Sequence, residues 1–212
     1  MNLNEYIDHT LLKPIATESD IKILCEQAVK HSFKSVCVNP CDVALCADLL
    51  KDTGVKVCTV IGFPLGKNTT AVKIYEAINA IASGATELDM VINVAKLKEG
   101  NVEYVKSEIE KVISISKGNV VKVIIESGLL TDSEIALATK TVCEAGADFV
   151  KTSTGITGGG ATENAVNIMK ANLFGKTKIK ASGGIKTKQD ALRYIELGAS
   201  RIGTSSGVEI VK

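Results

Sequence analysis

The segment Gly146-Ala147-Asp148-Phe149-Val150-Lys151-Thr152 decides the fold, because it joins a helix end to a short apolar strand. A glycine just past a helix can adopt the left-handed conformation and turn the chain into the next strand. The same step recurs at Gly84-Ala85, before the run 87–93, and at Gly198-Ala199, before the run 201–204. Helices that alternate with strands in this way predict parallel strands joined by crossovers.

Helix starts are predicted where a threonine precedes an acidic residue by three positions, the pattern of a capping box. The pairs are Thr17 with Asp20, Thr131 with Glu134 and Thr187 with Asp190. Apolar runs between the helices predict eight strands: Tyr6–Thr10, Ser35–Asn39, Lys56–Phe63, Glu87–Asn93, Val120–Glu126, Phe149–Thr152, Lys178–Ser182 and Arg201–Thr204.

Eight strands are the number that closes a barrel. The alternative, an open doubly wound sheet, usually carries a glycine-rich dinucleotide turn after its first strand, and none follows Thr10 or Asn39. The fold predicted is therefore α/β, a single-domain (β/α)8 TIM barrel that comprises residues 1–212.

Composition restricts the partners. The 212 residues carry 25 basic and 24 acidic side chains, a net charge of +1, so no strong field attracts nucleic acid or an anionic membrane. The start of the chain lacks a secretory pattern, and no apolar stretch reaches membrane-spanning length. We expect a cytoplasmic protein with no nucleic-acid or membrane partner.

The six cysteines raise the question of a disulfide or a zinc site. Cys37, Cys41 and Cys46 lie close together in the sequence, but their spacing contains no CxxC pair. We therefore expect buried free thiols and no metal.

Charged residues interrupt several of the predicted strands, where burial on both faces makes a charge costly unless it is paired or used in chemistry. Asp89 shares a face with Val91 and Asn93, and Lys151 shares one with Phe149 and Ser153. Two further sets with the same alternation are Lys122, Ile124 and Glu126, and Lys178, Lys180 and Ser182. If these faces point inward, Asp89, Lys122, Lys151 and Lys180 converge. Any one lysine taken alone is equally consistent with a solvated ion pair at a strand end.

Two lysines near one aspartate are chemically useful. Ammonium groups ~6 Å apart at an effective dielectric of ~20 repel by about 3 kcal/mol, or roughly two pK units. Only a neutral amine attacks a carbonyl, so a second cation can turn a lysine into a Schiff-base nucleophile. Neither His9 nor His31 lies in a catalytic motif, which leaves proton transfer to aspartate and lysine.

Glycine- and serine-rich loops follow the last two strands, at Gly183-Gly184 and at Gly203-Thr204-Ser205-Ser206. Barrels often bind phosphate with these two loops, through backbone N–H groups and hydroxyls. The loop 154–160 after Lys151 is also glycine-rich, which is a weak signal by itself.

These residues resemble the 2-deoxyribose-5-phosphate aldolase family, class I aldolases that form a Schiff base. The resemblance extends over nearly the whole chain, and the segments that carry it are 7–12, 36–40, 60–66, 87–93, 122–126, 149–155, 180–185 and 203–206. It implies reversible cleavage of 2-deoxy-D-ribose 5-phosphate to acetaldehyde and D-glyceraldehyde 3-phosphate in deoxyribonucleotide catabolism, with no cofactor or metal. It also implies a homodimer or homotetramer.

The resemblance assigns roles to individual residues. Lys151 is expected to form the Schiff base, Lys180 to perturb its pKa, and Asp89 to relay protons with Lys180 through water. The phosphate is expected to bind at Gly183, Gly184, Gly203, Ser205 and Ser206. Longer members end in a tyrosine tail, whereas this chain ends at Val211-Lys212, and Ile156 replaces an aromatic residue common in the family.

Two other functions remain compatible with the residues alone. Asp89 and Lys180 could act as a proton-transfer pair in a non-covalent isomerase or decarboxylase, which covalent trapping would distinguish. A non-catalytic sugar-phosphate sensor would bind without turnover, but recognition of a phosphate does not require several charges inside strands.

Overall fold

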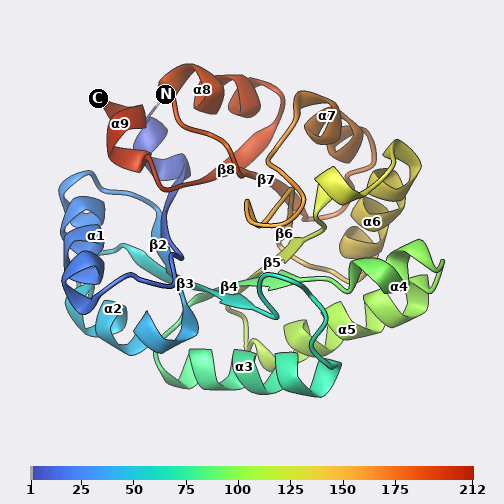
Figure 1. Ribbon diagram of the computed structural model, residues 1–212, viewed down its shortest axis with the longest axis horizontal. Helices are drawn as coiled ribbons and strands as arrows, with labels where there is room; N and C mark the ends of the chain where they lie inside the picture. The colour runs from blue at the N-terminus through green and yellow to red at the C-terminus, as the bar shows by residue number, and fades with distance from the viewer. Residues whose placement is uncertain (1) are drawn as a thin grey trace.

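The computed structural model describes residues 2–212, in which eight parallel strands form one closed barrel in chain order (Figure 1). Each strand pairs with the next, and β8 closes on β1 with Asp8 opposite Gly203. The predicted TIM barrel is confirmed, and the open sheet is wrong. The strands are β1 (Ile7–Leu11), β2 (Ser35–Val38), β3 (Lys56–Ile61), β4 (Glu87–Val91), β5 (Val120–Ile124), β6 (Phe149–Lys151), β7 (Lys178–Ser182) and β8 (Ala199–Thr204).

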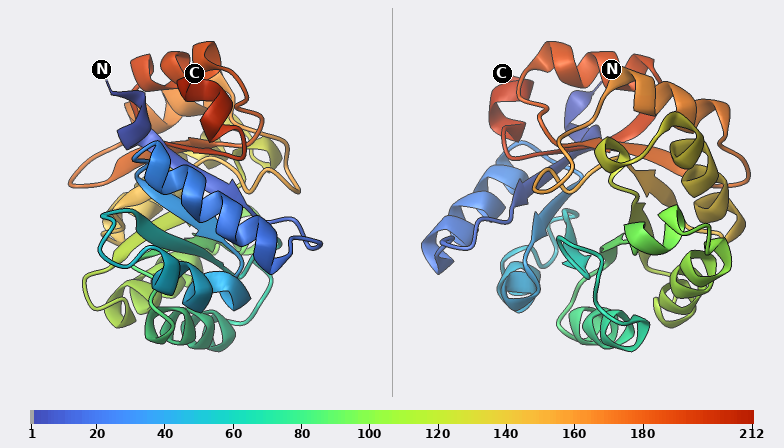
Figure 2. Two further views of the ribbon diagram at one scale, coloured as in Figure 1. Left: turned by 90° about the vertical axis from the view of Figure 1, so that its left-hand side faces the viewer. Right: turned by 45° about the vertical axis from the view of Figure 1, so that its right-hand side comes forward.

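Helices surround the barrel on its outside, as the two views in Figure 2 show. They are α1 (Glu18–Lys30), α2 (Val43–Leu49), α3 (Thr70–Ala82), α4 (Val94–Lys98), α5 (Val102–Ile115), α6 (Asp132–Glu144), α7 (Glu163–Ala171), α8 (Lys188–Glu196) and α9 (Gly207–Val211). Short 3-10 turns precede β1, α2 and α6: η1 (Leu3–Tyr6), η2 (Pro40–Asp42) and η3 (Ser127–Leu129). Within residues 2–212, no helix has both the length and the apolarity needed to cross a bilayer.

The local signals read from the sequence operate as predicted. Capping boxes start α1, α6 and α8 at the three predicted threonines. The three glycines of the Gly-Ala steps have φ values of 105°, 80° and 115°, which only glycine adopts readily. The helix-to-strand turns that set the barrel's repeat are therefore encoded locally.

Three predicted strands extend two residues too far, since β3 ends at Ile61, β4 at Val91 and β5 at Ile124. The predicted ends of β2 and β6 are each one residue too far. The polar residues that follow leave the ladder for other partners: the Asn93 side chain caps α4 by accepting from Lys96 N at 3.3 Å. Glu126 has a left-handed backbone, with φ 53° and ψ 58°. Alternation of side chains could not show where pairing stops.

The two faces of the strands have different partners. Residues such as Val36, Leu88 and Val123 point outward and pack with the helices in one continuous apolar core. The inward residues include the buried charges. All six cysteines are unpaired thiols in the described chain, and five are buried as predicted, but Cys41 is exposed because it lies in the surface turn η2.

Candidate active site

Asp89, in the middle of β4, is the centre at which the predicted lysines meet. Its Oδ2 accepts from Lys151 Nζ at 2.7 Å and from Lys180 Nζ at 2.8 Å, and its Oδ1 accepts from Lys122 Nζ at 2.8 Å. Lys151 is 4% exposed, and the other three side chains are fully buried. The structure thus brings together all four charged residues that strand alternation predicted to converge.

A second layer of charges lies beneath Asp89, toward the start of the strands, and the sequence reading did not identify it as part of the site. Asp8 contacts Lys180, and its Oδ1 lies 2.6 Å from Arg201 Nη1. Glu87 Oε2 lies 2.6 Å from Lys122 Nζ and 2.8 Å from Arg201 Nη1. The criterion that identified the lysines, a charge within an apolar strand, applies to this layer as well, because Asp8, Glu87 and Arg201 also interrupt apolar strands.

The charge balance of this cluster is uneven. Four basic groups share three carboxylates, so release of one proton from the cluster brings its net charge to zero. The basic groups are Lys122, Lys151, Lys180 and Arg201, and the carboxylates are Asp8, Glu87 and Asp89. Because the cluster is buried, electrostatic interactions within it are screened less than at the surface. A neutral amine in the cluster is therefore consistent with its environment.

The surrounding charges shift several pKa values. Burial acts to raise the pKa of Asp89, but Lys122, Lys151 and Lys180 outweigh it and hold that pKa well below its usual range. Burial likewise acts to lower the pKa of Lys180, but the carboxylates of Asp8 and Asp89 raise it overall. The pKa of Lys122 is also raised despite its burial, by Asp89 and its neighbours. Lys122 and Lys180 therefore remain ammonium groups at neutral pH, and Asp89 remains a carboxylate.

A cavity of about 380 Å³ opens above Lys151 at the carboxyl ends of the strands, the face on which barrel enzymes place their active sites. Lys151 lies in its wall, between the loops that follow β1, β6, β7 and β8. Apolar walls come from Leu11, Leu12 and Ile156, and two further lysines, Lys13 and Lys186, stand at the lining. The volume is suitable for a small molecule.

Four of the five predicted phosphate residues line this cavity: Gly183, Gly184, Gly203 and Ser205. Ser206 lies one residue further, as the N-cap of α9, and is not part of the lining. Gly183 and Gly184 have positive φ values of 88° and 79°. A Cβ on Gly203 would lie 3.0 Å from Lys180 Cε, so glycine at this position leaves room for the buried lysine.

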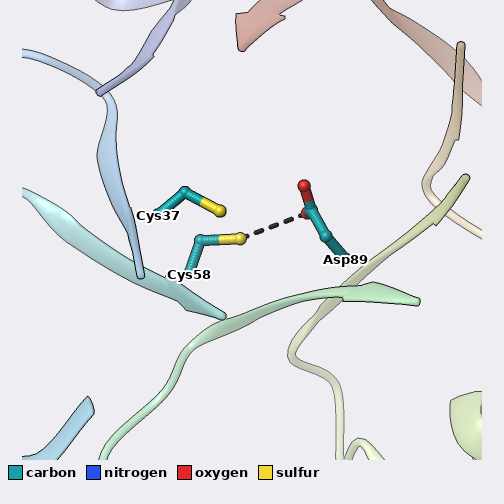
Figure 3. Close-up of side chains that lie close together, drawn as sticks. All are labelled: Cys37, Cys58 and Asp89. Atoms are coloured by element: carbon teal, nitrogen blue, oxygen red, sulfur yellow. Dashed lines mark hydrogen bonds between the residues drawn. The ribbon is translucent and has the colours of Figure 1, made fainter. Parts of the chain in front are cut away.

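Two thiols lie together on one side of Asp89 (Figure 3). Cys37 and Cys58 point toward its carboxylate, and Cys58 Sγ lies 3.1 Å from Asp89 Oδ1. These ligand atoms lie within 4.8 Å of one another, the one such group of three or more among residues 2–212. The three groups could ligate a soft cation. However, Asp89 already accepts from three ammonium groups, and burial raises the pKa of the Cys58 thiol well above its usual value, so we assign no metal to this cluster.

A larger cavity, of about 770 Å³, lies at the opposite end of the barrel. It is lined by the starts of the strands, including Lys56, Lys178 and Arg201. This face of a TIM barrel usually serves stability rather than catalysis. The smaller cavity is the candidate active site, because Lys151 enters it.

Comparison with known proteins gives a consistent result. The family model described as DeoC/LacD family aldolase matches residues 4–212. The deoxyribose-phosphate aldolase of Clostridium botulinum (strain Kyoto / Type A2) is 55% identical over 212 residues, which cover 100% of each chain. That of Thermoanaerobacter sp. (strain X514) is 54% identical over 215 residues, which cover 100% of this chain and 96% of the relative.

Solved structures of similar proteins share the fold. The tetrameric deoxyribose phosphate aldolase from Aeropyrum pernix superimposes with a TM-score of 0.91 at 38% identity, and the match covers 99% of this chain and 89% of that one. The aldolase QR15 gives a TM-score of 0.95 at 42% identity, with coverage of 99% and 94%.

Proposed function

Because the chain belongs to the DeoC/LacD family of aldolases, we propose that Lys151 is the lysine that forms the Schiff base with its substrate. The enzyme is a carbon–carbon lyase of the aldolase type. Its reaction is the reversible cleavage of 2-deoxy-D-ribose 5-phosphate to acetaldehyde and D-glyceraldehyde 3-phosphate. The observation that carries the assignment is that Lys151, alone among the three lysines on Asp89, lines the cavity.

The reaction begins when the neutral amine of Lys151 adds to the C1 aldehyde and water is lost, which gives a protonated imine. A base then removes the proton of the C3 hydroxyl, the C2–C3 bond breaks, and its electron pair moves into the imine. Glyceraldehyde 3-phosphate leaves, and an enamine of acetaldehyde remains on Lys151. Protonation of the enamine at C2 and hydrolysis release acetaldehyde and restore the amine.

We assign the supporting roles to Lys180 and Asp89. Lys180 retains its proton between Asp8 and Asp89, so its charge acts on the amine of Lys151 at short range. Asp89 Oδ2 accepts from both lysines, which supports a role for Asp89 as the group that relays protons with Lys180 through water. Gly183, Gly184, Gly203, Ser205 and Ser206 are the residues we assign to the phosphate, through backbone N–H groups and hydroxyls. Four of them line the cavity, and Ser206 follows as the N-cap of α9.

Covalent trapping tests this assignment. Incubation with acetaldehyde and borohydride, followed by peptide mapping, should find a reduced two-carbon adduct on Lys151 that is absent in Lys151→Arg. Lys73→Arg, which changes a buried lysine outside the barrel, is the matched control and should still be trapped. An adduct on Lys122 or Lys180 would overturn the assignment, and no adduct on any lysine would exclude the Schiff-base mechanism.

We also propose that the chain forms a homodimer or homotetramer, since the Aeropyrum pernix relative is described as tetrameric. The outer face of α3 offers a candidate interface, because Val72, Tyr75 and Ile78 follow one another at helical spacing and are 43%, 71% and 50% exposed. Light scattering of the purified protein should give a multiple of the chain mass, and a monomer at micromolar concentration would contradict the proposal.

A further inference from the structure

Glu126 combines three features that are unusual for a residue without an assigned role. It lies two residues after the end of β5, it is 1% exposed, and its backbone is left-handed, with φ 53°. Residues other than glycine, asparagine and aspartate rarely adopt this conformation, because it costs free energy. Surrounding structure must hold Glu126 in place, and such outliers often lie at functional sites.

The carboxylate of Glu126 accepts four hydrogen bonds, all from the loop after Lys151. Thr154 donates its backbone N–H to Oε1, and its hydroxyl donates to Oε2 at 3.2 Å. The Thr157 hydroxyl and the Gly158 N–H also donate to Oε2, the latter at 3.0 Å. An ionised carboxylate, which only accepts, matches a loop that presents only donors.

The same loop is pressed against the predicted phosphate site on its other side. A Cβ on Gly160 would lie 2.3 Å from the carbonyl oxygen of Gly183, and Ala161 N donates to that oxygen at 3.0 Å. On the Glu126 side, a Cβ on Gly128 would lie 1.6 Å from the carbonyl oxygen of Gly158. The loop is therefore a layer of glycine backbone held between the Glu126 turn and Gly183.

We propose that Glu126 is a positioning residue for recognition of the substrate's phosphate. Its carboxylate fixes residues 154–158, and the loop in turn fixes the Gly183-Gly184 backbone that faces the cavity. The inference rests on the proposed function, because it takes the Gly183-Gly184 loop as the phosphate site. It predicts that Glu126 affects selectivity for the phosphorylated sugar more than it affects carbon–carbon cleavage.

A comparison of two substrates separates this role from a merely structural one. 2-Deoxyribose 5-phosphate and 2-deoxyribose share the carbons that react and differ in the phosphate. A residue that only stabilises the fold lowers kcat/KM for both in proportion, so the ratio of the two values stays constant. A residue that positions the phosphate loop lowers the ratio.

Glu126→Gln is the informative variant, because it keeps the shape and places an NH2 donor against donors of the loop. We expect the ratio to fall about tenfold or more, as for loss of a hydrogen-bonded charge. Trapping of acetaldehyde, which has no phosphate, should persist. Glu134→Gln is the matched control, since Glu134 accepts from Thr131 N at an exposed helix start, and its ratio should not change.

Thr157→Val provides a second test that does not depend on folding of the Glu126 variant. Thr157 is exposed, and the substitution removes one of the four donors, so a smaller loss of the ratio is expected. An unchanged ratio in folded Glu126→Gln and in Thr157→Val would overturn the inference. A wild-type enzyme without any preference for the phosphorylated sugar would instead show that the proposed phosphate site is wrong.

Discussion

Two regions of this molecule bury a lysine against a carboxylate, and only one of them has the properties of an active site. Outside the barrel, between α3 and α5, Lys73 Nζ lies 2.6 Å from Glu108 Oε2 and also donates to the Val91 carbonyl at 2.8 Å. Inside the barrel, three lysines share the single carboxylate of Asp89. All of these contacts are short and almost fully buried.

The difference lies in the charge balance and in access. Glu108 has one ammonium partner and also accepts from the Thr70 hydroxyl at 3.1 Å, so the outer pair is matched and its hydrogen bonds are satisfied. The inner cluster has more basic groups than carboxylates, and one of its lysines lines a cavity. Burial of a charge is therefore no evidence of function by itself, whereas a shared carboxylate beside a cavity is.

The same substitution at one lysine of each region gives the strongest test of this distinction. Lys180→Met should lower kcat/KM for 2-deoxyribose 5-phosphate by roughly 10³–10⁴-fold, the upper range for loss of a group that transfers protons. The measurement is a coupled assay of glyceraldehyde 3-phosphate release, with folding checked by circular dichroism. A folded Lys180→Met enzyme within tenfold of wild type would show that Asp89 and Lys151 act without it.

Lys73→Met should have the opposite profile. Removal of one partner from a buried ion pair leaves Glu108 uncompensated, so the free energy of unfolding should fall by about 3–5 kcal/mol. Activity per folded molecule should change less than about threefold, because Lys73 does not line the cavity. Urea denaturation and kinetics on the same sample provide both numbers. A large loss of kcat with little loss of stability would place Lys73 in the chemistry.

The sequence identified the inner lysines because each interrupts an apolar strand. No knowledge of the packing was needed to identify Lys122, Lys151 and Lys180, since a barrel strand is buried on both faces. Lys73 could not be recognised in the same way, because a lysine on an amphipathic helix usually faces solvent. Its burial depends on Glu108, 35 positions away, and on the space left at Gly62.

The fold was predictable for a similar reason, and its details were not. The Gly-Ala turns and threonine caps are local signals that gave the alternation of helices and strands, and the apolar runs gave the number of strands. Strand ends depend on which partner a polar side chain finds in space. Glu126 illustrates this. In the sequence it continues the alternating pattern of β5, but in the structure its carboxylate accepts hydrogen bonds from the loop after β6. The contact of Arg201 with both Asp8 and Glu87 likewise requires barrel closure.

Replacement of both partners of the outer pair should be far less damaging than replacement of one. In Lys73→Met combined with Glu108→Leu, no buried charge remains at this site, and such exchanges are often neutral or stabilising. We expect the unfolding free energy to recover to within about 2 kcal/mol of wild type, because the Thr70 hydroxyl and the Val91 carbonyl each still lose a partner. If the double variant is no more stable than Lys73→Met alone, the attraction between Lys73 and Glu108 stabilises the fold by more than the desolvation of the two charges costs.

At alkaline pH, the contributions of Lys73 and Lys180 to the free energy of unfolding should change with pH in opposite directions. Burial lowers the pKa of Lys73 and Glu108 offsets this only in part, whereas the pKa of Lys180 lies above its usual value despite burial. A raised pKa contributes stability that is complete below the unfolded pKa, near 10.4, and is lost above it, by about 1.4 kcal/mol per pH unit. A lysine with a lowered pKa binds fewer protons in the native state than in the unfolded state between its native pKa and about 10.4. Stability therefore rises with pH in that range.

The measurement is urea unfolding between pH 9 and 11.5. The stability of wild type relative to Lys180→Met should decrease above pH 10.4, by about 1.4 kcal/mol per pH unit. Its stability relative to Lys73→Met should increase as the pH approaches 10.4. Parallel curves for the two variants would mean that the lysines experience the same environment, which would remove the basis of the comparison.

The smallest effect is expected at Cys58, and it tests which neighbours of Asp89 matter. The thiol lies 3.1 Å from Asp89 Oδ1, but the same oxygen also accepts from Lys122 at 2.8 Å. Because the ammonium contact is charged and the thiol is a weak donor, Cys58→Ala should leave Asp89 ionised and in place. We expect kcat/KM within about threefold of wild type and a stability loss of about 1 kcal/mol from the small cavity. A loss of activity comparable with that of Lys180→Met would mean that the thiol, and not only the balance of lysines and carboxylates, sets the reactivity of this cluster.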